Sequence, residues 1–296
     1  MELAMSIRNA ILCAVLVGFN LMASSAFAES SVWKVSKGEN YFYLGGTIHL
    51  LSAADHPLPD EFNLAYNDAG KIFFETDLAA TKTPEFQSKF IAAMMYSDDR
   101  TLQSELDPAI YRKLESFMTS RHMPIAQFSK FQPWGVSMMI VLFEYQRLGM
   151  MPNYGVDAYF NSLAVSDNKI IMSLETPDEQ INFLRSMAKI DQDIGVEYTL
   201  RDLKRLPEFI DSMKQNWRSG DLEALAESIF VAQMQREFPE LYDSIVTSRN
   251  NAWMRQLPRL TDDSEREFVL VGAMHLYGKE GLLNQLALQG FSVEQL

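Results

Sequence analysis

The chain has 296 residues but only one cysteine, Cys13. A single cysteine excludes an intrachain disulfide and the zinc sites that are built from several cysteines. Cys13 also lies within an expected signal peptide, so no cysteine nucleophile would remain in the mature chain. The fold must therefore be stabilised by its own apolar core, and a chain of this length can form one.

Basic residues are outnumbered by acidic ones, with 26 Lys and Arg against 39 Asp and Glu and a formal net charge of −13. Proteins bind nucleic acids largely through basic side chains that contact phosphates, and anionic lipid surfaces attract basic segments. The charge balance therefore argues against a nucleic-acid partner and against electrostatic attachment to a membrane.

Long uninterrupted apolar runs are also lacking after the first 28 residues. A membrane helix needs about 20 predominantly apolar residues. Residues 131–151 come closest, but they are interrupted by Gln132, Pro133, Glu144, Gln146 and Arg147. No stable membrane span is expected once the N-terminal segment is removed.

The N-terminal segment has the features of a secretory signal peptide. Arg8 supplies a positive charge, residues 11–21 are mostly apolar, and Ala26-Phe27-Ala28 matches a cleavage site of small residues. The apolar run is short for a bilayer span, although an uncleaved membrane anchor is the alternative. We expect residues 1–28 to be cleaved after Ala28, leaving an exported, periplasmic or secreted, protein with one domain over residues 29–296.

Familiar catalytic motifs are missing as well. The sequence contains no His-Glu-x-x-His pair, no Gly-x-Ser-x-Gly turn, no Walker loop and no Gly-x-Gly-x-x-Gly loop. These absences argue against a zinc-protease helix of that type, an α/β-hydrolase serine site and the usual nucleotide-binding loops.

The apolar pattern predicts an α/β fold with some α+β character. Strands are expected at residues 32–35, 41–44, 71–75, 169–175, 267–271 and 291–293. Helices are expected to fill most of residues 84–166 and 177–260. We therefore expect a small central mixed sheet, with strands from both ends of the chain, covered by many helices.

Two of the four histidines share one sequence context. Gly46-Thr47-Ile48-His49 follows the apolar run 41–44, and Gly272-Ala273-Met274-His275 follows the run 268–271. Each histidine thus ends a predicted strand, close to a glycine that lets other groups approach. A histidine in this position can bind a metal or transfer a proton, although a backbone carbonyl often satisfies a lone histidine there.

Two glutamates, Glu75 and Glu175, also end predicted strands. In α/β sheets, functional groups gather beyond the carboxyl ends of the strands. If the strands before His49 and His275 are neighbours, two imidazoles and one or two carboxylates would form an open site for Zn²⁺, Mn²⁺, Fe²⁺ or Co²⁺. Such an ion lowers the pKa of bound water and polarises a carbonyl, as hydrolysis of a peptide or ester requires.

Six sequence blocks resemble the TraB/PrgY/GumN family, which includes bacterial exported proteins and the Tiki proteases of animals. The blocks are residues 43–51, 74–77, 155–160, 174–180, 249–250 and 271–278, and the resemblance extends from about Val32 to Leu296. It implies metal-dependent peptide hydrolysis, with Mn²⁺ or Co²⁺ favoured, at a site made by His49, His275 and Glu75. Met274 departs from the family's common pattern, in which glycine is frequent, and this bulkier residue could narrow the site.

These observations leave three alternative functions open. The first is a metal-dependent hydrolase, a peptidase, in which His49 and His275 bind the ion and Glu75 is a third ligand or the general base. The second is a non-catalytic protein that sequesters a peptide in the same cleft. The third is a metal-free hydrolase with a histidine as the base, which a wider resemblance to erythromycin-esterase-like hydrolases implies.

Three further residues are predicted to support this site. Arg249 and Asn250 lie in a helical stretch and could hold a substrate carboxylate or orient a metal ligand, with a solvated helix face as the alternative. Glu175 is expected to be either a ligand or a partner behind the ligands. The sequence leaves open the peptide or small-molecule substrate, the native metal and the oligomeric state.

Overall fold

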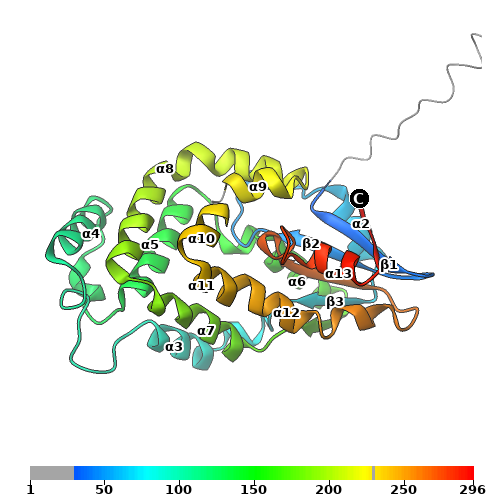
Figure 1. Cartoon of the computed structure of the whole chain (residues 1–296), viewed down its shortest axis with the longest axis horizontal. Coiled ribbons are helices and arrows are strands. Elements are labelled where there is room, and N and C mark those ends of the chain that lie inside the picture. The colour runs from blue at the N-terminus through cyan, green and yellow to red at the C-terminus, as the bar shows by residue number, and fades with distance from the viewer. Residues whose placement is uncertain (1–29, 229–230) are drawn as a thin grey trace, which may run out of the picture.

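The computed structural model describes residues 30–228 and 231–296, so the predicted signal peptide lies outside the described residues. A six-stranded mixed sheet in the order β4-β3-β5-β2-β1-β6 forms its centre (Figure 1). The strands are β1 (Val32–Lys37), β2 (Asn40–Thr47), β3 (Lys71–Phe74), β4 (Ile170–Ser173), β5 (Glu267–Gly272) and β6 (Ser292–Gln295). The predicted α/β class is confirmed, with strands from both ends of the chain and bounds within three residues of the expected ones.

Four neighbouring strands, β4, β3, β5 and β2, run parallel to one another. Strand β5 comes late in the chain yet lies between β2 and β3 in the sheet. In the sequence, β2 and β3 are separated by one α-helix, α2 (Asp60–Asp68). In this arrangement Thr47 lies opposite Gly272. The two Gly-x-x-His segments therefore leave the same edge of the sheet on adjacent strands.

Helices cover both faces of the sheet. On one face, alternate strand residues pack against α2, α6 (Val156–Ser166) and α8 (Gln192–Arg218), in a core that includes Phe62, Ile72, Phe160, Trp217, Phe268 and Leu270. On the other face they pack against α12 (Ser248–Trp253) and α13 (Leu282–Leu288), in a core that includes Phe42, Leu44, Trp253, Val269, Val271 and Leu286. Because both faces are covered, residues 268–271 form the continuous apolar run that the sequence displays.

The remaining helices lie outside these two layers or connect them. Helices α3 (Pro84–Ala93), α4 (Pro108–Ser120) and α5 (Pro133–Arg147) extend away from the sheet (Figure 1). The others are α7 (Pro177–Arg185), α9 (Leu222–Ser228), α10 (Val231–Glu237) and α11 (Pro239–Tyr242), and short helical turns link them, such as η5 (Ser186–Lys189) and η7 (Leu257–Thr261). Within residues 30–228 and 231–296, no helix combines the length and apolarity of a membrane span.

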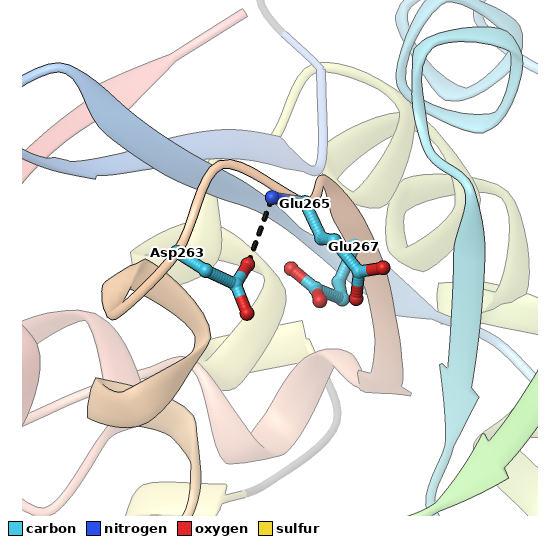
Figure 2. Close-up of side chains that lie close together, drawn as sticks. All are labelled: Asp263, Glu265 and Glu267. Atoms are coloured by element: carbon cyan, nitrogen blue, oxygen red, sulfur yellow. Dashed lines mark hydrogen bonds between the residues drawn. The ribbon is translucent and has the colours of Figure 1, made fainter.

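Strand β5 carries ionisable residues at both of its ends. It begins at the buried residue Glu267, after a loop that bears the exposed residues Asp263 and Glu265 (Figure 2). It ends at Gly272, followed by the turn η8 (Ala273–His275). The acidic group and the second histidine motif therefore lie at opposite ends of one buried strand.

Candidate functional site

The four predicted strand-end residues lie beyond the carboxyl ends of four adjacent parallel strands. His49 follows β2, Glu75 follows β3, Glu175 follows β4 and His275 follows β5. The backbone pairing continues past the strands, since the Glu175 amide donates to the Glu75 carbonyl at 2.9 Å. The insertion of β5 between β2 and β3 brings together residues that are up to 226 positions apart, counted as 275 minus 49.

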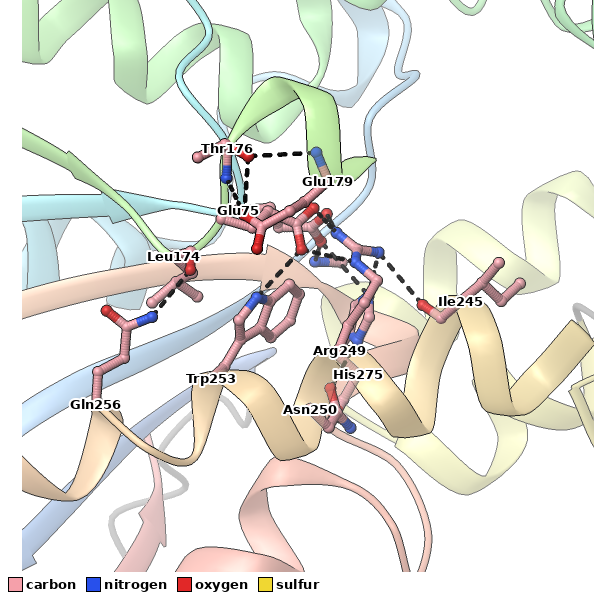
Figure 3. A network of polar contacts seen from close by, with 12 residues as sticks. Glu75, Leu174, Thr176, Glu179, Ile245, Arg249, Asn250, Trp253, Gln256 and His275 are labelled. Atoms are coloured by element: carbon pink, nitrogen blue, oxygen red, sulfur yellow. Dashed lines mark hydrogen bonds and ion pairs between the residues drawn. The ribbon is translucent and has the colours of Figure 1, made fainter. Parts of the chain in front are cut away.

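Arg249 connects three of these groups (Figure 3). Its Nε and Nη2 donate to Glu175 Oε2 and Oε1 at 2.9 and 2.6 Å, and Nη2 also donates to Glu75 Oε2 at 2.6 Å. Its Nη1 donates to Nε2 of His275 at 3.0 Å. Arg249 lies in α12, directly after the π-helical turn η6 (Asp243–Thr247), and such turns are frequent at functional sites.

Burial and the Arg249 guanidinium together shift the pKa values of Glu75 and Glu175 in opposite directions. Glu75, Glu175 and Arg249 are 6, 7 and 8 % exposed. Burial by itself would raise the pKa of Glu75, but the positive charge of Arg249 holds that pKa well below its ordinary value. Burial raises the pKa of Glu175, although the hydrogen bonds and charge of Arg249 oppose this. Glu75 is therefore the firmly ionised member of the pair.

His275 is held as a neutral ring. The Asn250 amide donates through Nδ2 to the carbonyls of His275 and Glu280, at 3.0 and 2.8 Å, so its Oδ1 is the acceptor for Nδ1–H of His275 at 2.7 Å. Nε2 then carries the lone pair that accepts from Arg249. Burial lowers the pKa of His275 to about 3, which agrees with this neutral tautomer.

His49, unlike His275, has surroundings that raise its pKa. Its side chain is 62 % exposed, and Nδ1 donates to Asp157 Oδ2 at 2.7 Å. Asp157 also accepts a hydrogen bond from Thr47 Oγ1 at 3.1 Å, which fixes the carboxylate. The charge of Asp157 raises the pKa of His49 to about 9, so this ring is protonated at neutral pH.

Gly155 allows α6 to bring Asp157 to His49. A Cβ atom on Gly155 would lie 2.1 Å from the carbonyl oxygen of His49, so a larger residue cannot fit without a shift of the backbone. The amide of Val156 then donates to the Ile48 carbonyl at 3.1 Å. Asp157 was missed as a site residue in the sequence, although it lies in the family-like block 155–160, two positions after this glycine.

His49, Glu75 and His275 converge on the space beside Gly272. A Cβ atom there would lie 3.2 Å from Glu75 Oε1, 3.7 Å from His275 Cδ2 and 3.8 Å from His49 Nε2. The Gly272 amide donates to Glu75 Oε1 at 2.6 Å, and Nε2 of His275 lies 3.8 Å from the same oxygen. The absence of a side chain at Gly272 therefore leaves room between the three predicted ligands.

The orientation of the three predicted ligands matches a metal site, but their spacing does not. Both histidines engage an oxygen through Nδ1 and leave Nε2 towards the site, as metal-binding histidines commonly do. The ligand atoms of the two histidines and Glu75 do not all lie within 4.8 Å of one another, although Nε2 of His275 is 3.8 Å from Glu75 Oε1. Among the described residues, only Asp263, Glu265 and Glu267 meet this limit as a group. A metal ion would therefore require the predicted ligands to draw closer.

Met274 is half-buried and packs against neighbouring apolar residues. It contacts a small apolar cluster that includes Tyr242 and Val246, and so joins the end of β5 to α11 and η6. This packing gives the bulkier side chain a structural partner on the elements that precede Arg249.

An open cleft of about 560 Å³, with both polar and apolar residues in its lining, lies next to Arg249. Its lining includes Phe183, whose ring centre is 5.6 Å from the Arg249 guanidinium carbon, and Ser248, the preceding residue in the chain. Its volume is within the range of sites that bind small molecules. A more enclosed apolar cavity of about 300 Å³ between α5, α8, α10 and α11 is lined by none of the predicted site residues.

These features define an α/β protein with a buried carboxylate–arginine–histidine network at the carboxyl ends of its parallel strands. The chain belongs to the TraB/PrgY/gumN family, whose sequence model matches residues 31–295, and the predicted family is confirmed.

Two relatives have the name "Uncharacterized protein YbaP". The protein of Escherichia coli (strain K12) is 26 % identical over 250 residues, which cover 84 % of this chain and 88 % of that protein. The protein of Shigella flexneri is 25 % identical over the same length and the same shares. No solved structure matches the chain.

Proposed function

We propose that the protein is a metal-dependent hydrolase that acts on peptides, with His49, His275 and Glu75 as the metal ligands. The observation that supports this is the shared orientation of the two histidines. Each engages an acceptor through Nδ1, Asp157 or Asn250. Nε2 of His49 lies beside the space at Gly272, and Nε2 of His275 lies 3.8 Å from Glu75 Oε1. When bound, a divalent cation such as Mn²⁺, Co²⁺ or Zn²⁺ would lower the pKa of water and polarise the scissile carbonyl.

The charge of Glu75 supports a ligand role. Arg249 keeps its pKa well below the ordinary value, so the carboxylate is available to a cation at neutral pH but is a weak proton acceptor. A second condition concerns Arg249 itself. Its Nη1 donates to Nε2 of His275, so this lone pair becomes available only when the guanidinium moves away. His49 must likewise lose the proton on Nε2, because its pKa of about 9 keeps the ring protonated at neutral pH and only the neutral ring binds a metal.

Four residues around the ligands have positioning roles in this proposal. Asp157 and Asn250 orient the two rings through Nδ1. Glu175 and Trp253 hold the site from behind, since Trp253 Nε1 donates to Glu175 at 3.2 Å and Glu175 accepts from Arg249. Arg249, once released from His275, would lie where it can stabilise negative charge on the carbonyl oxygen of a substrate.

The test is metal-stimulated cleavage of a mixed peptide library by the protein purified without chelator. Turnover with Mn²⁺, Co²⁺ or Zn²⁺ is expected to fall by more than about 100-fold in His49→Ala, His275→Ala and Glu75→Gln. His122→Asn, at the end of α4, and Glu144→Gln, a buried carboxylate paired with Arg121, are the matched controls and should retain activity. Unchanged turnover in the three site variants, with no metal in the purified protein, would refute the proposal.

A metal-free hydrolase is the second candidate, and the His49–Asp157 pair favours it. An exposed imidazole that a carboxylate orients through Nδ1 is the arrangement of a general acid–base group. Turnover that resists chelator and is lost in His49→Ala and Asp157→Asn would favour this candidate. Peptide binding that survives every substitution, with no turnover under any ion, would favour a sequestering protein.

Export belongs to the same proposal. The N-terminal segment predicts removal of residues 1–28, and the mass of the protein recovered from its cells would test it. A mature chain that begins at Glu29 is expected, whereas a chain that retains Met1 would refute cleavage.

A further inference from the structure

Three carboxylates gather at the start of β5, at the opposite end of this strand from His275 (Figure 2). Ligand oxygens of Asp263, Glu265 and Glu267 all lie within 4.8 Å of one another. The Glu265 amide donates to Asp263 Oδ1 at 2.8 Å, which turns the loop back towards the strand. Three negative groups at this spacing repel one another unless a positive charge or a proton neutralises them.

Glu267 is the buried member of this group. It is 4 % exposed, and its Oε2 is buried with no hydrogen-bond partner among the described residues. Burial raises the pKa of the Glu267 carboxyl, and the nearby charge of Asp263 acts in the same direction, against Lys71. A buried carboxylate oxygen is costly without a partner, and a cation held beside Asp263 and Glu265 would supply one.

Lys71 neutralises part of the cluster. It begins β3, its Cα lies opposite that of Glu267, and its Nζ forms an ion pair with Glu265 Oε2. Three carboxylates and one ammonium group still leave two negative charges. A divalent ion would balance them, in competition with Lys71 for Glu265.

We propose that Asp263, Glu265 and Glu267 bind a hard divalent cation of the Ca²⁺ type, which fastens the loop before β5 to the sheet. Carboxylate oxygens are the ligands that such ions prefer, and no histidine or cysteine of the described residues belongs to the group. Because Asp263 and Glu265 are exposed and Lys71 competes, we expect a dissociation constant of about 10⁻⁴ to 10⁻³ M. The site lies at the other end of β5 from His275 and does not depend on the proposed hydrolase activity.

Thermal unfolding of the purified protein tests the site, with Ca²⁺ as the probe. About 10 mM CaCl₂ is at least ten-fold above the expected dissociation constant and should raise Tm by about 3 to 10 °C relative to NaCl of equal ionic strength. Asp263→Asn and Glu267→Gln should weaken Ca²⁺ binding by about ten-fold or more in calorimetry, and Lys71→Met should strengthen it. Asp99→Asn, an exposed carboxylate elsewhere, is the control that should retain the response.

Several outcomes would overturn the proposal. One is a Ca²⁺ effect no larger than that of NaCl, and another is a full response in both Asp263→Asn and Glu267→Gln. If Glu267→Gln fails to fold, the exposed position Asp263 still gives a decisive answer. A combined His49→Ala and His275→Ala variant should keep the Ca²⁺ response, and its loss would assign the binding to the other end of β5.

Discussion

The substitution Arg249→Met is expected to destabilise the protein strongly. Methionine can replace much of the aliphatic part of the arginine but not the hydrogen bonds that Nε and Nη2 donate to Glu75 and Glu175. Both carboxylates are less than a tenth exposed, so water cannot replace the guanidinium without opening the site. The substitution thus leaves two negative charges close together in a buried region.

The size of the effect follows from this burial. Removing one partner of a buried ion pair costs about 3 to 5 kcal/mol. In a chain of this length, 1 kcal/mol corresponds to about 2 to 4 °C in Tm. We therefore expect Tm to fall by about 6 to 20 °C at neutral pH, measured by circular dichroism, with urea unfolding for the free energy.

The pH dependence gives a second signature with a defined sign. In the wild type the pKa of Glu75 is lowered, so its contribution to stability is present above about pH 4.5 and is lost as the pH falls further. Without Arg249, burial raises the pKa of Glu75 and that of Glu175 above the ordinary value. The folded variant then binds protons that the unfolded chain does not, so its stability rises as the pH falls from about 8 to 5. The stability difference between the two proteins should narrow over this range.

Arg100→Met is the matched control for the loss of a guanidinium group. Arg100 is 54 % exposed and pairs with Asp98 on the surface, where water replaces the ion pair, so its removal should leave Tm nearly unchanged. If Arg249→Met costs less than about 1 kcal/mol, or if its stability follows the pH as that of the wild type does, then the guanidinium does not hold the two carboxylates as we have argued.

Three further predictions concern the two histidines and α6. The pKa of His275 is lowered to about 3, so its contribution to stability is present above its unfolded pKa of about 6.5 and is lost as the pH falls. Urea unfolding should show a loss of at most about 2 kcal/mol in the free energy of unfolding between pH 6.5 and 5. The variant His275→Asn should lack this pH dependence. Equal slopes would contradict a neutral ring. Asp157→Asn should bring the pKa of His49 from about 9 towards its ordinary value. In the wild type, His49 contributes stability that is present below about pH 6.5 and is lost as the pH rises to about 9, and this contribution should become smaller in the variant. An NMR titration in which the pKa of His49 stays near 9 would rule out Asp157 as the cause. Gly155→Ala should lower the free energy of unfolding in urea by at least about 1 to 3 kcal/mol, because its Cβ atom would lie 2.1 Å from the His49 carbonyl oxygen. The control Gly195→Ala, in an open position of α8, should be neutral or stabilising. Similar effects at both positions would show that the contact with His49 is unimportant.

Local sequence signals predicted most of the elements. Residues 268–271 form an apolar run because β5 is covered on both faces, and such a run is visible without knowledge of the neighbours. Thr176 and Glu179 form a reciprocal capping box at the start of α7, which depends only on residues three positions apart. The order of the strands was not predictable in this way, since pairing between β2 and β5 depends on contacts across more than two hundred residues.

The sequence by itself determined that His49, Glu75, Glu175 and His275 each end a strand, because strand ends follow from local apolar patterns and the residues after them. It did not distinguish the two Gly-x-x-His histidines, whose local contexts are alike. Only the tertiary structure decided that Asp157, 108 positions away, charges the exposed ring of His49, while burial and Asn250 keep His275 neutral. The physical reason is that a protonation state depends on burial and on charges within a few ångströms, and the packing of distant segments supplies both.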